Sequence, residues 1–190
     1  PYATADYSIF VAEVASTLNE ILLKEEMLRT IKDKNVRLSL LMEYLDGIKG
    51  TVFRQTQFAE FELMIHKEVE NGKSLSGESL TRMYESLLKK YYGHEDGICL
   101  IEKPIPVEWA YVPHFYYNFY VYQYATSFTA STALAEKIIN KEEGSLGRYV
   151  NFLKAGGSDY PINLLKKARV DMTSPEPFEL TMQAMNRTMD

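Results

Sequence analysis

Apolar residues recur at helical spacing along almost the whole chain. Near the amino end, Phe10, Val14 and Leu18 stand four residues apart within a mostly apolar stretch, which is the spacing of one buried helix face. Similar patterns predict helices over residues 7–28, 35–70, 78–92, 114–141, 145–154, 161–169 and 176–185. No stretch alternates convincingly between apolar and polar positions, so the sequence predicts an all-α fold with residues 1–190 forming a single multi-helix domain.

Several side chains mark where these helices begin or bend. Asp6, Ser76 and Ser174 precede helical stretches and can accept a hydrogen bond from an otherwise unpaired backbone N–H. Gly47 and Gly50 lie inside the second stretch, and each weakens a helix by about 1 kcal/mol relative to alanine. We therefore expect a kink or a close helix contact there rather than a break.

Composition excludes several classes of protein. The chain is 46% hydrophobic, which is too apolar for a disordered segment, and it has no apolar run of the roughly 20 residues that a membrane helix needs. A net charge of −5 argues against nucleic acid or an anionic membrane as the main partner. The single cysteine, Cys99, excludes an intrachain disulfide framework and predicts a cytoplasmic protein.

One carboxylate stands in an apolar setting. Glu13 lies within Ile9–Ser16, where its neighbours are mostly apolar, and Glu20 follows two turns later on the same face. A carboxylate that loses hydration needs a metal, a cation or hydrogen bonds in compensation. The alternative is that Glu13 sits half-exposed at the edge of the apolar face, or pairs with Arg37 or Arg54.

The histidines do not complete a metal site by themselves. His66, His94 and His114 are far apart in the sequence, and the chain has no Cys-x-x-Cys and no His-x-x-x-His, so spacing alone predicts no complete zinc centre.

Six of the 14 tyrosines fall between Tyr111 and Tyr124, after a stretch, 93–113, with three prolines that predicts a long loop. On a helix that begins near His114, Tyr117 and Tyr124 would share one side, with Tyr120 beside them. Phenol and imidazole groups held in a row can donate hydrogen bonds to an oxyanion that develops in a transition state. The alternative is an aromatic helix packed into the core.

Five stretches that cover much of the chain form a recognisable set: 5–20, 45–56, 58–62, 114–125 and 152–158. The first contains Val11-Ala12-Glu13-Val14-Ala15-Ser16. In content and in order these stretches resemble the oligoendopeptidase F family of thimet-type zinc metallopeptidases. As a set they are specific, although no single one would be.

The resemblance implies an all-α catalytic domain that cuts short peptides in a deep channel with a zinc cofactor. It makes Glu13 the third zinc ligand, beside the two histidines of a His-Glu-x-x-His motif, and Glu20 a residue that orients a ligand histidine. It assigns the transition-state donors to the tyrosine-rich stretch: His114, Tyr117 and Tyr124 first, with Tyr120 and Tyr122 as further candidates.

The chain also departs from the family pattern. The His-Glu-x-x-His segment is absent from the 190 residues, and the resemblance places it shortly before Pro1. We therefore expect the carboxyl-terminal part of a catalytic domain, inactive by itself and without stoichiometric zinc, whose unpartnered helix faces make self-association plausible. Arg169 stands where the resemblance expects glycine. The alternative function is a non-enzymatic all-α module that binds a peptide or protein through its tyrosine-rich surface.

Overall fold

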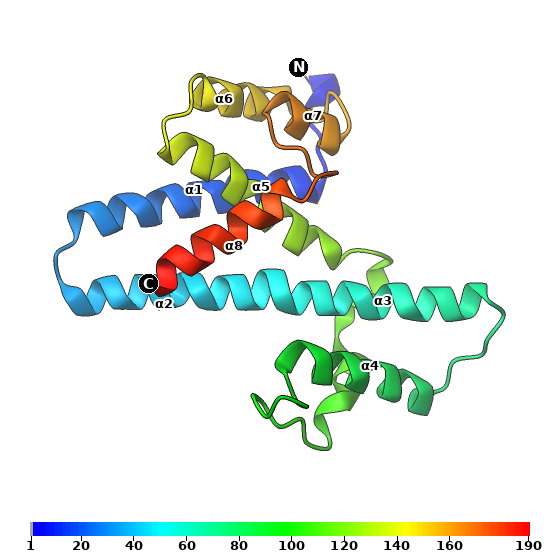
Figure 1. Cartoon of the computed structure of the whole chain (residues 1–190). Coiled ribbons are helices and arrows are strands. Elements are labelled where there is room, and N and C mark those ends of the chain that lie inside the picture. The colour runs from blue at the N-terminus through cyan, green and yellow to red at the C-terminus, as the bar shows by residue number, and fades with distance from the viewer. Residues whose placement is uncertain (1) are drawn as a thin grey trace. The chain divides into compact units, whose positions relative to one another are not determined.

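The computed structural model describes residues 2–190; Pro1, with which the predicted domain 1–190 begins, lies outside the described residues. Over the described part the chain forms eight α-helices and no strand (Figure 1), so the predicted all-α fold is confirmed. The α-helices are α1 Ile9–Thr30, α2 Lys34–Ile48, α3 Arg54–Glu70, α4 Gly77–Tyr92, α5 Tyr122–Ile139, α6 Ser145–Ala155, α7 Pro161–Lys167 and α8 Glu176–Met189. Short 3-10 helices cover Tyr2–Thr4, Ile105–Tyr111 and Pro113–Tyr117, and a π-helical turn covers Lys49–Phe53. No helix in residues 2–190 is long and apolar enough to cross a membrane.

The chain divides into two compact units. Unit 1 comprises residues 2–52 together with 123–190, and unit 2 comprises residues 53–122.

Unit 1 is built around α1, which lies antiparallel to α2 and crosses α5 (Figure 1). Its core joins Val14 and Leu18 of α1 to alanines of α5 and to Leu165 of α7, all essentially buried. Small residues on α5 let the backbones of α1 and α5 approach each other closely. The Ser131 hydroxyl can therefore donate to the carbonyl oxygen of Val14, at 3.0 Å. This contact fixes the turn of α1 that carries Glu13.

Unit 2 pairs α3 with α4 around an aromatic core. Phe61 and Tyr84 meet edge-on with ring centroids 5.2 Å apart, and both side chains are buried. Glu108 connects the 3-10 helix Ile105–Tyr111 to both helices. It accepts a hydrogen bond from the Tyr84 hydroxyl of α4 at 2.6 Å and forms an ion pair with Arg54 of α3. The stretch before the tyrosine-rich segment is therefore ordered rather than a loop throughout, which corrects the prediction for 93–113.

The glycine pair of the predicted 35–70 helix lies at a π-helical turn. The helix does not break there, but its hydrogen-bond pattern widens between α2 and α3. A Cβ placed on Gly47 or on Gly50 would meet no atom within 4 Å. The expected distortion is present, whereas a close helix contact is not the reason for the glycines.

The predicted caps have mixed outcomes. Ser76 caps α4, since its hydroxyl accepts the Ser79 backbone N–H at 3.2 Å. Asp6 does not cap α1, because the helix begins at Ile9 and Ser8 holds the N-cap position. Ser174 does not cap α8, where Pro175 holds that position and the Ser174 hydroxyl instead donates to the Asp171 carbonyl oxygen.

The prediction of one helix over 114–141 is wrong in its first part. Pro113–Tyr117 is a 3-10 helix, and α5 begins only at Tyr122. Between them Asn118 and Phe119 have positive φ values of 35° and 56°, which an α-helix does not allow. Of these aromatic residues Phe115 packs against the core of unit 2, whereas Tyr116, Tyr117 and Phe119 are exposed, so they do not form one buried helix face.

Candidate functional site

Glu13 lies on the second turn of α1 and is half-buried. Its Oε2 accepts a hydrogen bond from the Ser16 hydroxyl at 3.2 Å. Neither of the two arginines considered from the sequence pairs with the Glu13 carboxylate. Arg37 donates to the carbonyl oxygens of Leu28 and Ile31, and Arg54 pairs with Glu108. The carboxylate therefore sits at the edge of the apolar face, without a cation from Arg37 or Arg54.

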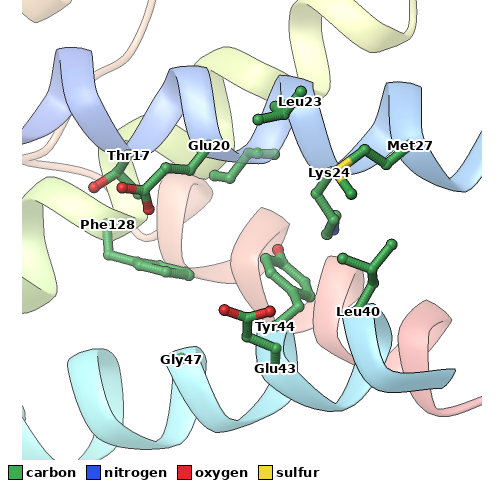
Figure 2. A pocket seen from close by; sticks show the side chains of 11 residues that line it. Thr17, Glu20, Leu23, Lys24, Met27, Leu40, Glu43, Tyr44, Gly47 and Phe128 are labelled. Atoms are coloured by element: carbon green, nitrogen blue, oxygen red, sulfur yellow. The ribbon is translucent and has the colours of Figure 1, made fainter. Parts of the chain in front are cut away.

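Glu20, two turns along α1, lines a pocket of about 350 Å³ between α1 and α2. Figure 2 shows the Glu20 side chain pointing from α1 towards this pocket, which Tyr44 of α2 and Phe128 of α5 also line. The ammonium of Lys24 lies 3.3 Å from the centroid of the Tyr44 ring, a favourable cation–π contact. Burial raises the pKa of Tyr44 to about 12, so its hydroxyl remains a donor at neutral pH.

The tyrosine-rich segment, residues 113–121, brings three of the predicted residues together although it is not an α-helix. The rings of His114 and Tyr120 stack with centroids 5.9 Å apart, and the ring of Tyr117 lies 6.0 Å from that of Tyr120. Tyr120, a further candidate by sequence, is thus the middle member of the row. Tyr117 is 66% exposed, whereas His114 and Tyr120 are half-buried. This row places hydrogen-bond donors at the surface of unit 2.

The segment is held at both ends and near its middle. Val112 and Val121 are buried in the core of unit 2, and Phe115 packs against it. Phe119, between them, has a backbone conformation that costs a residue with a side chain about 1–2 kcal/mol. Its backbone N–H donates to Oε1 of Glu62 at 2.6 Å.

Glu62 is a residue that the sequence reading missed. It lies on α3 and is only 1% exposed, among the aromatic residues of that helix. The signal that drew attention to Glu13, a carboxylate in an apolar helix face, was also present at Glu62.

The predicted site residues fall into different units. Glu13, Glu20 and Tyr124 belong to unit 1, and the others, His114, Tyr117, Tyr120 and Tyr122, belong to unit 2. Tyr124 is half-buried in the first turn of α5, while Tyr122 is exposed.

No group of three His, Cys, Asp or Glu side chains in residues 2–190 is arranged to hold a metal ion. The remaining candidate ligands have local contacts of their own. Nδ1 of His94 accepts the Ile101 backbone N–H at 3.0 Å, and the ring of His66 lies against Phe119 at 4.4 Å between centroids. Cys99 is exposed. Glu13 thus offers a single carboxylate, and the side chains of residues 2–190 do not complete a metal-binding group around it.

Comparison with known proteins identifies the family. The sequence pattern of Peptidase family M3 matches residues 1–184. The chain is 52% identical to Oligopeptidase PepF of Bacillus subtilis, over 100% of this chain and 28% of that protein, and 52% identical to Group B oligopeptidase PepB of Streptococcus agalactiae, over 93% of this chain and 29% of that protein.

The solved structures agree. The fold matches the crystal structure of oligoendopeptidase-F from Enterococcus faecium with a TM-score of 0.86 and 48% identity, covering 95% of this chain and 35% of that one. It matches a putative peptidase from Chlamydophila abortus with a TM-score of 0.92 and 44% identity, covering 99% of this chain and 31% of that one. The chain thus spans about a third of the length of these relatives. On the match over residues 1–184 and these identities, the chain belongs to peptidase family M3.

Proposed function

We propose that this chain is the part of a zinc-dependent oligopeptidase that follows the His-Glu-x-x-His motif, and that the whole enzyme hydrolyses peptide bonds of short peptides. The observation that carries the proposal is the 52% identity, over the full chain, to a protein named an oligopeptidase. The two units would together form part of one catalytic domain, and the complete protein would be cytoplasmic.

Glu13 fits the role of one zinc ligand. Its carboxylate is half-buried, and within residues 2–190 its side-chain hydrogen bond comes from the hydroxyl of Ser16, a neutral and weak competitor for a cation. A hard carboxylate beside two imidazoles is a common ligand set of catalytic zinc, which supplies Lewis acidity toward the scissile carbonyl and the attacking water. Glu20 would accept the free N–H of a ligand histidine and hold its orientation.

The side chains of the tyrosine-rich segment would stabilise the transition state. His114 and Tyr117 would donate hydrogen bonds from unit 2, and Tyr124 from the start of α5. Such donors are effective when they are aimed at the position where negative charge develops and not at the ground-state carbonyl. Tyr120, which stacks on His114, and Tyr122 are the further candidates.

The test compares two carboxylates of the same helix in the full-length peptidase. Glu13→Gln should lose bound zinc, measured by elemental analysis, together with hydrolysis of a fluorogenic short peptide. Glu26→Gln is the matched control, because Glu26 also lies on α1 but is exposed and pairs with Arg29. Full zinc content and activity in Glu13→Gln would refute the ligand assignment.

The proposal also predicts how the 190-residue chain behaves alone. It should hydrolyse no peptide and bind no stoichiometric zinc, because one carboxylate does not make a site. Exposed apolar side chains on α1 and α2, among them Leu23, Leu38 and Met42, support self-association of the isolated chain, which sedimentation at several concentrations would measure. A tightly bound zinc in the isolated chain would contradict the proposal.

A further inference from the structure

One buried carboxylate of unit 2 has a contact that the proposed mechanism does not use. Glu62 is 1% exposed, and its Oε1 accepts the backbone N–H of Phe119 at 2.6 Å. The hydrogen bond links residues 57 positions apart in the sequence, from α3 to the tyrosine-rich segment. A buried carboxylate is costly unless its hydrogen bonds compensate for lost hydration, so this position calls for an explanation.

The partner of Glu62 has a backbone conformation that is unfavourable for a residue with a side chain. Phe119 has a φ of 56° and follows Asn118, whose φ is 35°. A left-handed conformation in a residue with a side chain persists only where the surroundings hold it. Two contacts do so here: the carboxylate of Glu62 accepts the Phe119 backbone N–H, and the ring of His66 lies 4.4 Å from that of Phe119 between centroids. Both holding residues come from α3.

This turn sets where the neighbouring rings lie. Tyr117 precedes the two positive-φ residues and Tyr120 follows them, yet their rings are 6.0 Å apart, and Tyr120 stacks on His114. An extended backbone at 118 and 119 would separate the rings on either side of the turn. Phe119 itself is 44% exposed, so burial of its own ring does not account for the conformation.

We propose that Glu62 is a positioning residue: by holding Phe119 in the left-handed conformation, it keeps His114, Tyr117 and Tyr120 in one row. This inference rests on the proposed function in so far as the row donates to the transition state. Glu62 does not itself touch the reacting atoms in this scheme. It acts through the backbone of Phe119.

The first test measures the segment directly in the 190-residue chain. In Glu62→Ala, hydrogen exchange of the backbone amides in 113–121, followed by mass spectrometry, should become about 10- to 100-fold faster, as expected for loss of a hydrogen bond to a charged group. In Glu62→Gln the increase should be smaller, because the amide oxygen can still accept. Glu60→Ala is the matched control: Glu60 is also on α3 and accepts from Lys90 and Tyr91, but not from the segment. Unchanged exchange in Glu62→Ala, or an equal increase throughout unit 2, would overturn the proposal.

The second test asks whether the effect passes through the backbone of residue 119. In the full-length peptidase, Glu62→Ala should lower kcat on the order of 10- to 100-fold with little change in KM, because the donors are misplaced only relative to the transition state. Adding Phe119→Gly should restore much of kcat, since glycine adopts positive φ without support. Adding Phe119→Ala should not, because alanine also loses the ring but keeps the strain. Equal behaviour of the two double variants would overturn the proposal.

The two tests separate the two claims. If the unmodified full-length protein hydrolyses no peptide, the proposed function fails, while the exchange measurement still decides whether Glu62 holds the segment. If the enzyme is active and exchange in 113–121 does not respond to Glu62→Ala, the positioning role fails and the function stands.

Discussion

The backbone N–H of Gly157 donates a hydrogen bond to the carbonyl oxygen of Thr4, at 2.9 Å. The segment that leads into α1 is therefore held against the end of α6. A Cβ on Gly157 would overlap the carbonyl oxygen of Asp6, and Gly156, beside it, has a φ of 54°. The absence of a side chain is thus a steric requirement of the path by which the chain enters α1.

We predict that Gly157→Ala lowers the free energy of unfolding by about 1–3 kcal/mol, since backbone must move to admit the methyl group. Gly147→Ala is the matched control, because a Cβ at Gly147, inside α6, meets no atom within 4 Å and alanine favours a helix by about 1 kcal/mol. Urea unfolding would measure both. Equal stability of the two variants would contradict the steric argument.

Arg169→Gly should stabilise the chain. Arg169 has a φ of 62° at the end of α7, where its N–H donates to the Lys166 carbonyl oxygen and that of Val170 to the Leu165 carbonyl oxygen, the pattern of a Schellman motif. Glycine removes the left-handed penalty, and the ion pair that is lost among residues 2–190 is a 3.8 Å contact of an exposed side chain with Glu142. We expect a gain of about 0.5–1 kcal/mol by thermal or urea unfolding.

Arg169→Ala separates backbone conformation from side-chain loss. Alanine removes the same ion pair but keeps the strain, so it should not stabilise the chain. A gain as large as that of Arg169→Gly would show that the side chain, and not the backbone, was responsible.

Tyr84→Phe should cost about 1–2 kcal/mol of stability. Burial raises the pKa of Tyr84, so its hydroxyl stays protonated and donates to Glu108, which would lose one of its two partners in unit 2. Tyr91→Phe is the control: Tyr91 on α4 also donates to a carboxylate that has a cationic partner, but the Glu60 side chain is 34% exposed against 18% for Glu108, so water can replace the lost hydrogen bond more easily. Urea unfolding should show the smaller effect for Tyr91→Phe, and the reverse order would contradict the role of Glu108.

Stability should fall at acid pH partly through Asp159. The hydrogen bond from Lys167, followed by those from Asn163 and the Tyr160 backbone, lowers the pKa of Asp159 from 3.8 to about 2. A carboxyl whose pKa is lower in the folded chain stabilises it above the unfolded pKa, and this contribution is lost as pH falls from about 4 towards 2. Asp159→Asn should make stability less dependent on pH in that window, as followed by urea unfolding at several pH values. An unchanged pH dependence would argue that Asp159 is not coupled to folding.

In the full-length peptidase, Tyr124→Phe should keep its zinc and lower kcat, because only a donor to the transition state is removed. The expected loss is about 10²- to 10³-fold, the usual effect of removing one such donor. Tyr122→Phe, a change of the same kind two residues earlier on an exposed side chain, should have a smaller effect on kcat measured with the same peptide. An unchanged kcat in Tyr124→Phe would mean that the Tyr124 hydroxyl does not take part in catalysis and that the ring contributes only to packing.

Helices such as α1 and α4 could be predicted from the sequence, whereas the turn at Asn118 and Phe119 could not. Apolar spacing located α1 because Val14 and Leu18 face one core, and Ser76 marked the start of α4 through local backbone chemistry. The stretch after His114 has helical spacing of aromatic residues, but its conformation depends on Glu62, which is 57 residues distant from Phe119. A pattern within one window cannot contain such a contact, and for the same reason it did not show Glu62 as part of the candidate site.

The division of the chain into two units has a consequence for the order in which it folds during synthesis. Unit 2 is a continuous stretch, 53–122, whereas unit 1 joins residues before it to residues after it. The core that contains Val11 and Val14 together with Leu165 and Val170 closes loops of about 150 residues, and such closure is slow compared with local helix pairing. On the ribosome, α3 and α4 can bury their aromatic core soon after Tyr122 has emerged, while α1 must wait for α7. The helix that carries Glu13 is therefore made before unit 2 but reaches its final packing after it.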